Sequence, residues 1–441
     1  MLNQKMRGYL ASSHDTRMLD ILCGLKDVHI LSIERLDTTL ITLEMDITKR
    51  QRKFCPTCSS LCVIKDRPVV IINDLPAFQF PVRLRLVKHR LRCPNAACPV
   101  TTFTLTDPRI APRRSSTSTR CAKYLTRQVG NGVTISRLAA EIGCSWHTVN
   151  RSVTRFGAAL LAADTQRVKK TVAMGLDEIS FRKPVREARQ WCTTVTGVDS
   201  YQLIDILPTR EAAPVAAYLA HMPQAFHQTV RYGTLDMSAL YSAIYSVALP
   251  HVTQVVDPFH VVQCANRSLD EVRRRVQAAT WGTRVKRSAP LYRARRRLLT
   301  GEERLSPKAR ELLSSLLELG DPDGEVAFAH RIKEAIRDFY DRSLSYASAE
   351  ALLDDVILHL SASAVSPEMR RLGRTLHTWK SRILAWHTCH FSNGKTEAAN
   401  RTIKLMKRIG YGFTNFENFR VRALLFAGHP TWKLLDSIRI D

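Results

Sequence analysis

Hydrophobic and polar residues alternate along much of the first hundred positions. Between about Met18 and Ile47, the segments VHILSIERL and TLITLEMDI alternate and predict a strand hairpin. The later segments VIKDRPVVIINDL and FPVRLRLVKHRLRC alternate in the same way and predict further strands. The segment TDPRIAPRRSSTST, rich in Pro, Ser, Thr and Arg, then predicts a linker, and helical spacing follows from about Arg120 to Ala163.

A series of short apolar runs follows the helical stretch. TVAMGLD, QWCTTVTGV, YQLIDIL, TVRYGTLD and TQVVD predict strands, with helices near residues 215–221 and 239–247. Three strands, a helix, a strand, a helix and a strand is the order of an α/β ribonuclease-H-like core. From Phe259 to about Thr388 the spacing is helical throughout, which predicts a long all-helical insertion (about 264–388) before a final helix in NGKTEAANRTIKLMKR.

Charge is the unusual feature of the composition. The 441 residues suggest two to four domains, and 66 Lys and Arg against 40 Asp and Glu give a formal net charge of +26. The cations are spread along the chain, which favours contact with nucleic acid in several places. The chain has no signal-peptide-like start and no apolar run of membrane length, so we expect a cytosolic protein whose 11 cysteines are not disulfides.

Two pairs of cysteines have the spacing of zinc knuckles. Cys55 and Cys58 are separated by two residues, and Cys93 and Cys98 by four. Each knuckle can turn two thiolates toward one tetrahedral Zn²⁺ at about 2.3 Å. With the alternating segments between them, they predict a zinc ribbon with one structural Zn²⁺; the alternative is a set of buried free cysteines. Cys62 has no matching partner, and we expect it not to bind the metal.

The segment VTISRLAAEIGCSWHTVNRSVTRFG predicts a helix-turn-helix. Gly143 suits the left-handed position after the first helix, and Ser145 can cap the second. Val149, Val153 and Phe156 recur at helical spacing and should face inward. The outward residues of the second helix could read base edges and hold phosphates, unless the segment is a plain helical hairpin: His147, Thr148, Asn150, Arg151 and Arg155.

Three carboxylates carry the candidate chemistry. Asp177 and Asp236 close apolar runs, so both are expected at strand ends, and Glu397 lies on the final helix. Converging carboxylates repel one another unless a divalent cation lies between them, which in so basic a chain indicates metal-dependent cutting or joining of a phosphate backbone. Glu397 shares its helix face with residues suited to DNA phosphate: Asn400, Arg401, Lys404 and Arg408. The alternative is a simple Glu397–Arg401 pair.

Two further residues follow the last strand. The run VVDPFHVV contains Asp257 and His260, which either order the active-site edge or form a helix cap with a buried histidine bonded to backbone. The residue next to Asp177, Glu178, should point to the opposite face of the sheet. We therefore assign it no metal.

The order of these motifs resembles the ISL-three group of bacterial insertion-sequence DDE transposases. The resemblance runs through GLDEISFRK, LDMSALY, VVDPFHVV and HFSNGKTEAANRTIKLMKRIGYGFTNFENFRVRALL. It implies that Asp177, Asp236 and Glu397 are the catalytic triad, and that Asp257 and His260 form a supporting element. Two Mg²⁺ about 4 Å apart, replaceable by Mn²⁺, would then serve cleavage and strand transfer. No NTP is expected, because the chain has no P-loop.

The resemblance also implies partners and a domain plan. We expect binding to double-stranded DNA, at terminal inverted repeats and at target DNA, by a homodimer or higher oligomer associated with the bacterial nucleoid. The expected parts are a zinc-ribbon module (1–108), a helix-turn-helix region (109–165), the catalytic domain (166–430) and a tail (431–441). The rivals are a catalytically silent, transposase-derived DNA-binding regulator and a structure-selective nuclease.

Overall fold

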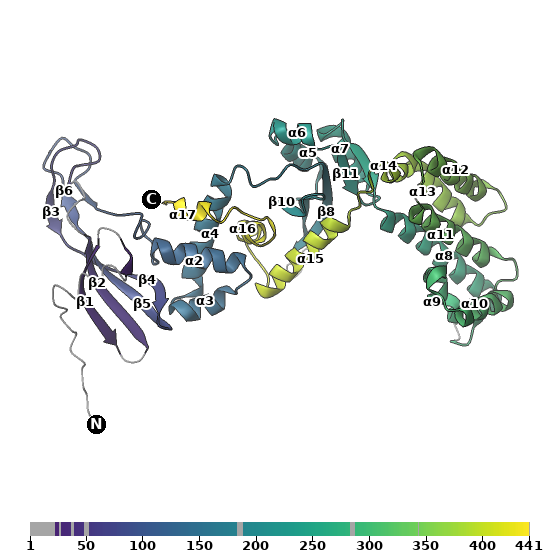
Figure 1. Cartoon of the computed structure of the whole chain (residues 1–441), viewed down its shortest axis with the longest axis horizontal. Helices are drawn as coiled ribbons and strands as arrows, with labels where there is room; N and C mark the ends of the chain where they lie inside the picture. The colour runs from purple at the N-terminus through teal and green to yellow at the C-terminus, as the bar shows by residue number, and fades with distance from the viewer. Residues whose placement is uncertain are drawn as a thin grey trace, which may run out of the picture. The chain divides into compact units, whose positions relative to one another are not determined.

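The computed structural model describes residues 23–25, 28–36, 39–47, 53–182, 188–282, 287–342 and 344–440 (Figure 1). The chain divides into two compact units. The first comprises Met1–Arg167 with Ile403–Asp441, and the second comprises Val168–Thr402. Among the described helices, none has both the length and the apolar character needed to cross a membrane.

A four-stranded sheet lies near the start of the first unit. Its order is β1-β2-β5-β4, in which β1 and β2 form the predicted antiparallel hairpin and β2 pairs with β5 in parallel. The alternating residues of these strands bury one face, with Met45 and Leu84 fully inaccessible. Residues 18–22, where the hairpin prediction began, lie outside the described residues. The strands are β1 (Val28–Leu36), β2 (Leu40–Ile47), β4 (Val69–Ala77) and β5 (Phe80–Val87).

A separate three-stranded sheet carries the cysteine pairs. It consists of β3 (Val63–Asp66), β6 (Arg90–Arg92) and β7 (Thr102–Thr104), in the order β3-β6-β7. The sequence analysis placed all the alternating segments between the knuckles in one ribbon. In the structure the two longest of these strands join the sheet of the N-terminal hairpin instead, where β5 pairs with β2 and β4 pairs with β5.

Helices from two parts of the chain complete the described portion of the first unit. The predicted helix-turn-helix is present: Gly143 has φ 68°, and the Ser145 hydroxyl accepts a hydrogen bond from the Thr148 N–H at 3.2 Å. Apolar residues of the three helices between Thr119 and Ala163 form one core with Val421, Leu425 and Leu435 from the end of the chain. The helices are α2 (Thr119–Gly130), α3 (Ile135–Ile142), α4 (Trp146–Ala163), α16 (Phe416–Ala427) and α17 (Leu434–Ser437).

The second unit is built on a mixed five-stranded sheet. The apolar runs form strands in the predicted order, β8 (Ala173–Arg182), β9 (Gln190–Gly197), β10 (Gln202–Leu207), β11 (Tyr232–Leu235) and β12 (Thr253–Val256). The sheet order is β10-β9-β8-β11-β12; β8, β9 and β10 are antiparallel, whereas β11 is parallel to both β8 and β12. The connecting helices are α5 (Ala212–Ala220), α6 (Gln224–Thr229) and α7 (Ala239–Ala248) (Figure 1).

The central strand β8 presents different chemistry on its two faces. Met174 and Leu176 are fully buried in a core shared with α5 and α7. Because side chains alternate along a strand, the residues between and after them, Gly175 and Asp177, face the other side. That side receives the N-terminal part of α15 (Gly394–Ile409), where the candidate site lies.

The predicted helical insertion is confirmed. From Pro258 to Cys389 the described residues form helices and turns without a strand. Their apolar faces share one core, with Leu269, Val272 and Leu291 among its fully buried members. The elements are α8 (Pro258–Trp281), α9 (Pro290–Leu299), η1 (Glu302–Arg304), α10 (Pro307–Gly320), α11 (Glu325–Asp341), α12 (Tyr346–Ser361), α13 (Pro367–Leu384) and α14 (Trp386–Cys389).

Candidate active site and metal centre

Asp177 lies within a strand and not at its end. β8 continues to Arg182, and Asp177 is paired with Thr194 of β9, so the expectation of a strand-terminal aspartate was wrong for this residue. Asp236 does follow the last residue of its strand, Leu235. The parallel register matches Thr234 with Gly175, and continuing it by two residues sets Asp236 opposite Asp177.

Burial and nearby negative charges act on both aspartates. The pKa of Asp177 is raised, chiefly by burial and further by the negative charges of Asp236 and Glu397. The pKa of Asp236 is raised by burial and by the negative charge of Glu178, while His260 acts in the opposite direction. Carboxylates that disfavour one another's ionisation are the groups that a nearby cation would stabilise.

The start of α15 is tied to the sheet by buried polar groups. Asp257 caps α8 by accepting from the Phe259 N–H at 2.8 Å, and its other oxygen accepts from the Asn393 N–H at 2.6 Å. The Thr234 hydroxyl donates to Asn393 Oδ1 at 3.1 Å. Asp257 therefore forms the helix cap that the sequence analysis gave as one of two possibilities. The same carboxylate also fixes the segment that leads to Glu397.

Asn400 makes the most direct contact with Asp177. Its Nδ2 donates to Asp177 Oδ2 at 2.7 Å, and the backbone N–H of Glu178 donates to Asp177 Oδ1 at 2.7 Å. Asn400 is 3% exposed, so it does not belong to the solvent-facing basic face on which the sequence analysis set it. Its Oδ1 is buried and has no hydrogen-bond partner among the residues that the structure describes.

Glu397 has two basic neighbours. Its carboxylate lies 3.7 Å from His260 Nε2 and 3.4 Å from Arg401 Nη2. The intrahelical Glu397–Arg401 pair considered as an alternative is thus formed. His260 is part-exposed and directed at Glu397, in contrast to the buried, backbone-bonded histidine of the alternative. The remaining cations predicted on this helix, Lys404 and Arg408, are exposed.

The oxygens of the three carboxylates do not all lie as close together as the ligands of a single ion. Across the described ranges, the four-cysteine cluster is the one group of three or more His, Cys, Asp or Glu whose ligand atoms all lie within 4.8 Å of one another. Glu178 pairs with Arg210 at 3.2 Å. Ion binding at the acidic site therefore calls for side-chain rearrangement.

Gly175 permits the close approach of α15 to β8. A Cβ at this position would overlap Thr396 Oγ1 and would lie 2.9 Å from both Asn393 Oδ1 and Thr234 Oγ1. These groups sit in the polar contact that anchors the Glu397 helix. Sequence reasoning missed Gly175, Asn393 and Thr396, although the polar start of NGKTE, directly before a helix, was a usable signal.

We expect Gly175→Ala to displace the start of α15 and to slow DNA cleavage about 10²-fold, because small misplacements of reacting groups are costly. Overpacking should lower the free energy of unfolding by about 1–3 kcal/mol. Gly394→Ala is the matched control, since its Cβ would meet only Ser392 Oγ at 3.4 Å. Cleavage kinetics with thermal unfolding check this; a full cleavage rate in Gly175→Ala would contradict the role.

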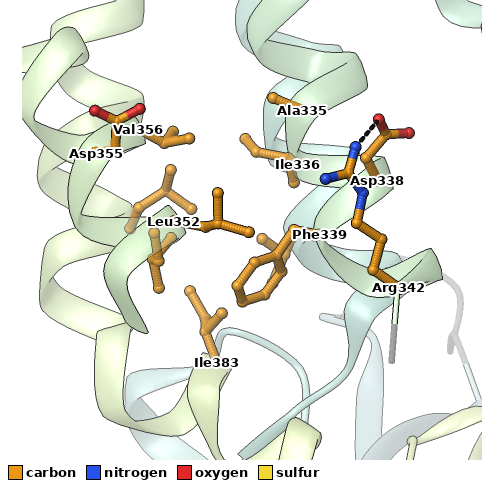
Figure 2. A pocket seen from close by; sticks show the side chains of 12 residues that line it. Ala335, Ile336, Asp338, Phe339, Arg342, Leu352, Asp355, Val356 and Ile383 are labelled. Atoms are coloured by element: carbon orange, nitrogen blue, oxygen red, sulfur yellow. Dashed lines mark hydrogen bonds and ion pairs between the residues drawn. The ribbon is translucent and has the colours of Figure 1, made fainter. Parts of the chain in front are cut away.

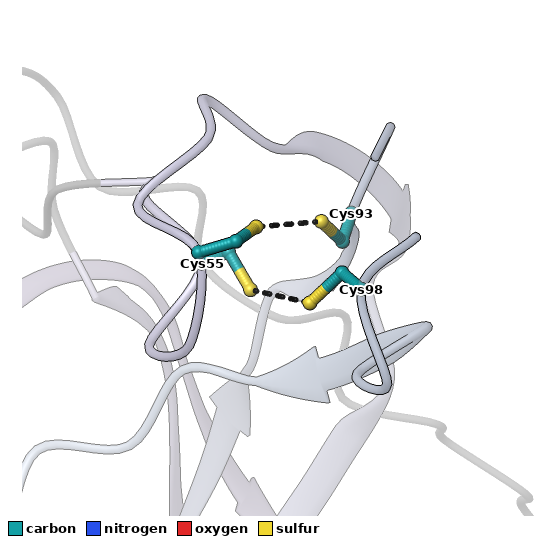
Figure 3. A group of neighbouring side chains, drawn as sticks. Cys55, Cys93 and Cys98 are labelled. Carbon is teal, nitrogen blue, oxygen red and sulfur yellow. Dashed lines mark hydrogen bonds between the residues drawn. The ribbon is translucent and has the colours of Figure 1, made fainter. Parts of the chain in front are cut away.

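The four predicted cysteines converge in the first unit (Figure 3). Sγ atoms of Cys55 and Cys98 lie 3.7 Å apart, and those of Cys58 and Cys93 lie 3.5 Å apart. Zn–S bonds of about 2.3 Å give a tetrahedron whose edge is about 3.8 Å, so the cluster has the size of a zinc site. Cys62 lies outside this group, and its sulfur instead donates to the Ser60 carbonyl.

The environment of the thiols also differs from that of ordinary buried cysteines. Hydrogen bonding with Ser60 lowers the pKa of Cys58 to about 6, and backbone N–H groups near Cys58 lower that of Cys55. Burial raises the pKa of Cys93 to about 12. The pKa values are therefore lowered on one knuckle and raised on the other, and a bound cation would favour the thiolate form of all four cysteines.

A cavity of about 180 Å³ lies elsewhere in the second unit, within the helical insertion (Figure 2). Ile336, Phe339 and Leu352 line it, and Asp338 and Arg342 pair at its rim at 3.4 Å. Its lining is mainly apolar and includes none of the three candidate carboxylates. We therefore assign it no part in the candidate chemistry.

The second helix of the helix-turn-helix presents the predicted polar face. Val149, Val153 and Phe156 are buried, as expected from their spacing. His147 and Arg151 are exposed, and the other three residues of the predicted face are partly exposed: Thr148, Asn150 and Arg155. This helix therefore offers polar and basic side chains to solvent along one face.

Comparison with known proteins agrees with the motifs. Residues 174–423, more than half of the chain, match the ISL3 family of DDE proteins, described as transposase. The chain is 24% identical over 380 residues to the transposase for insertion sequence element IS1001 of Bordetella parapertussis, which covers 84% of this chain and 88% of that protein. It is 26% identical over 310 residues to the transposase for IS1557 of Mycobacterium tuberculosis H37Rv, covering 65% and 67%. The chain therefore belongs to the ISL3 family of insertion-sequence transposases.

Proposed function

We propose that this transposase cuts and joins DNA at the terminal inverted repeats of its element, with Asp177, Asp236 and Glu397 as the catalytic carboxylates. One observation carries the proposal: the register of β8 and β11 sets Asp236 opposite Asp177, and the Asn400–Asp177 hydrogen bond brings the helix of Glu397 to the same place. The strand order supports a ribonuclease-H-like core around them.

The residues of the site fit divalent cations. Asp236 Oδ1 and Asn400 Oδ1 are buried oxygens without hydrogen-bond partners, and hard cations such as Mg²⁺ prefer oxygen ligands. Asp177, Asp236 and Glu397 would hold two Mg²⁺, which Mn²⁺ could replace. When bound, the ions supply an activated water or 3′-hydroxyl and stabilise the leaving oxygen.

Neighbouring residues keep the carboxylates in place. Asn400 fixes the orientation of Asp177 through its 2.7 Å hydrogen bond, and Asp257 holds the Asn393 backbone and so the start of α15. His260 lies 3.7 Å from the Glu397 carboxylate and also favours the charged form of Asp236. Exposed Arg401 and Lys404 can accept DNA phosphate at the same helix.

The test of this function is strand cleavage by the purified full-length protein. DNA carrying the flanks of the gene should be nicked at the element ends with Mg²⁺ or Mn²⁺, and the freed 3′-hydroxyl should join target DNA. Ca²⁺, with longer and looser coordination, should support binding more than cleavage. Equal cleavage after chelation of divalent ions would contradict the proposal.

We assign end recognition to the first unit. The zinc ribbon would hold one structural Zn²⁺, and the polar face of α4 would enter the major groove. Arg151→Ala should weaken binding to the element ends several-fold, with His221→Ala in the second unit as a control. If Arg151→Ala kept full affinity for the element ends, the recognition surface would lie outside this face of α4.

We retain the plan of residues 1–108, 109–165, 166–430 and 431–441 as a proposal, together with assembly as a dimer or higher oligomer on DNA. A catalytically silent regulator is the weaker alternative. It would have no use for a third acid on α15, or for a buried network that fixes the start of that helix against the sheet. The family match, which includes all three acids, also favours the enzyme.

A further inference from the structure

Arg422, on α16, is a buried cation with no anionic partner. It is 5% exposed, and in the part of the chain that the structure describes its guanidinium has no hydrogen bond or ion pair; Nε is fully enclosed. Burial lowers its pKa to about 10, so it remains charged at neutral pH. Buried charges are normally paired, because removing an ion from water is costly.

The groups around Arg422 compensate this charge only in part. The guanidinium carbon lies 4.7 Å from the centre of the Phe413 ring, a cation–π distance. The nearby end of α15 does not bind it: the Met406, Lys407 and Arg408 carbonyls accept from backbone N–H groups of the loop at residues 410–412. Lys407 and Arg408, in the last turn of the helix, add positive charge.

The loop between α15 and α16 brings an aromatic side chain to the same place. Tyr411 is 93% exposed and has φ 53°, a left-handed conformation that is unfavourable for tyrosine. Its N–H donates to the Arg408 carbonyl at 3.1 Å, and the Gly412 N–H donates to the Lys407 carbonyl at 2.9 Å, which fixes the turn. A Cβ on Gly410 would lie 3.2 Å from Arg422 Nη2, so the guanidinium reaches the backbone of this loop.

From these contacts we propose that the 410–413 loop and Arg422 form a nucleotide-binding site on DNA. Arg422 takes one phosphate of the backbone, and Tyr411 packs against the sugar next to it. The phosphate oxygens supply the anionic partner that matches the planar fork of the guanidinium. The site rests on the proposed function only in taking DNA as the ligand, and it is separate from the metal chemistry.

Salt dependence separates the two contacts. With the full-length protein and a fluorescent mixed-sequence duplex, Arg422→Met should lower the slope of log affinity against log salt by about 0.9, the value for one phosphate contact. Tyr411→Ala should weaken binding with the slope unchanged, because an uncharged side chain displaces no counterion. Arg422→Lys should keep most of the slope.

Stability distinguishes a binding role from a structural one. Because Arg422→Met removes a buried unpaired charge, its unfolding midpoint should equal or exceed that of the unsubstituted protein. Arg420→Met is the control: it removes the same charge from the same helix, at a more exposed residue 3.9 Å from Glu417, and should leave the slope unchanged.

Three results would overturn the inference alone: an unchanged slope in Arg422→Met, an equal fall in Arg420→Met, or full affinity in Tyr411→Ala. Failure of the unsubstituted protein to bind DNA would instead overturn the proposed function, and this site with it.

Discussion

Glu397→Gln should abolish DNA cleavage while leaving the fold and DNA binding intact. The substitution keeps the shape of the side chain but removes a charge that, with Asp177 and Asp236, would hold the cations. Because Glu397 is only part-buried and lies at the start of α15, little stability should be lost. We expect a fall in the cleavage rate of at least about 10³-fold, measured in single-turnover assays at saturating Mg²⁺.

The three carboxylates should also behave as one unit. Asp177→Asn and Asp236→Asn should each reduce cleavage nearly as far as the triple substitution, because losing one ligand already disables the shared site. Glu178→Gln is the matched control, since this neighbour of Asp177 pairs with Arg210 and is assigned no metal. Independent, additive losses from the three substitutions would argue against a common metal site.

Cys93→Ser should remove the zinc and unfold the three-stranded sheet that carries the knuckles. The unsubstituted protein should contain about one Zn²⁺ per chain, whose binding energy stabilises a sheet too small to fold alone. Metal analysis and limited proteolysis of the first unit provide the measurement. Burial raises the pKa of the Cys93 thiol, so Cys93 stays protonated when no metal is bound. The stability of the sheet should therefore depend on the metal.

The control for this substitution is a cysteine that lies beside the four-sulfur group. Cys62 is equally buried but bonds to the Ser60 carbonyl and stands outside the four-sulfur group. Cys62→Ser should therefore keep the zinc content. Zinc retained in Cys93→Ser, or lost equally in both variants, would refute the assignment of the four ligands.

Local patterns in the sequence were enough to predict much of the fold. Apolar runs such as TVRYGTLD became strands in the predicted order, and Gly143 and Ser145 marked the helix-turn-helix through their own backbone preferences. The cysteine knuckles were predictable because each pair is close in sequence. These features depend on residues only a few positions apart.

Features set by distant partners were not predictable in the same way. Alternation tells which face of a strand is buried but not which strand it pairs with, so the parallel pairing of β2 with β5 was missed. Asn400 looked like a surface residue from helical spacing; its burial depends on Gly175, which lets α15 approach β8 closely. Arg422 carried no sequence signal, since its missing partner shows only in three dimensions.

The most direct test of the acidic site is diffraction from crystals of the protein soaked in Mn²⁺. Anomalous density should appear between Asp177 and Asp236, with the Glu397 carboxylate moved from Arg401 toward it, and should vanish in Asp177→Asn. The account would be contradicted if Mn²⁺ bound at other sites but not between Asp177 and Asp236, with the Asn400–Asp177 hydrogen bond and the Glu397–Arg401 pair unchanged.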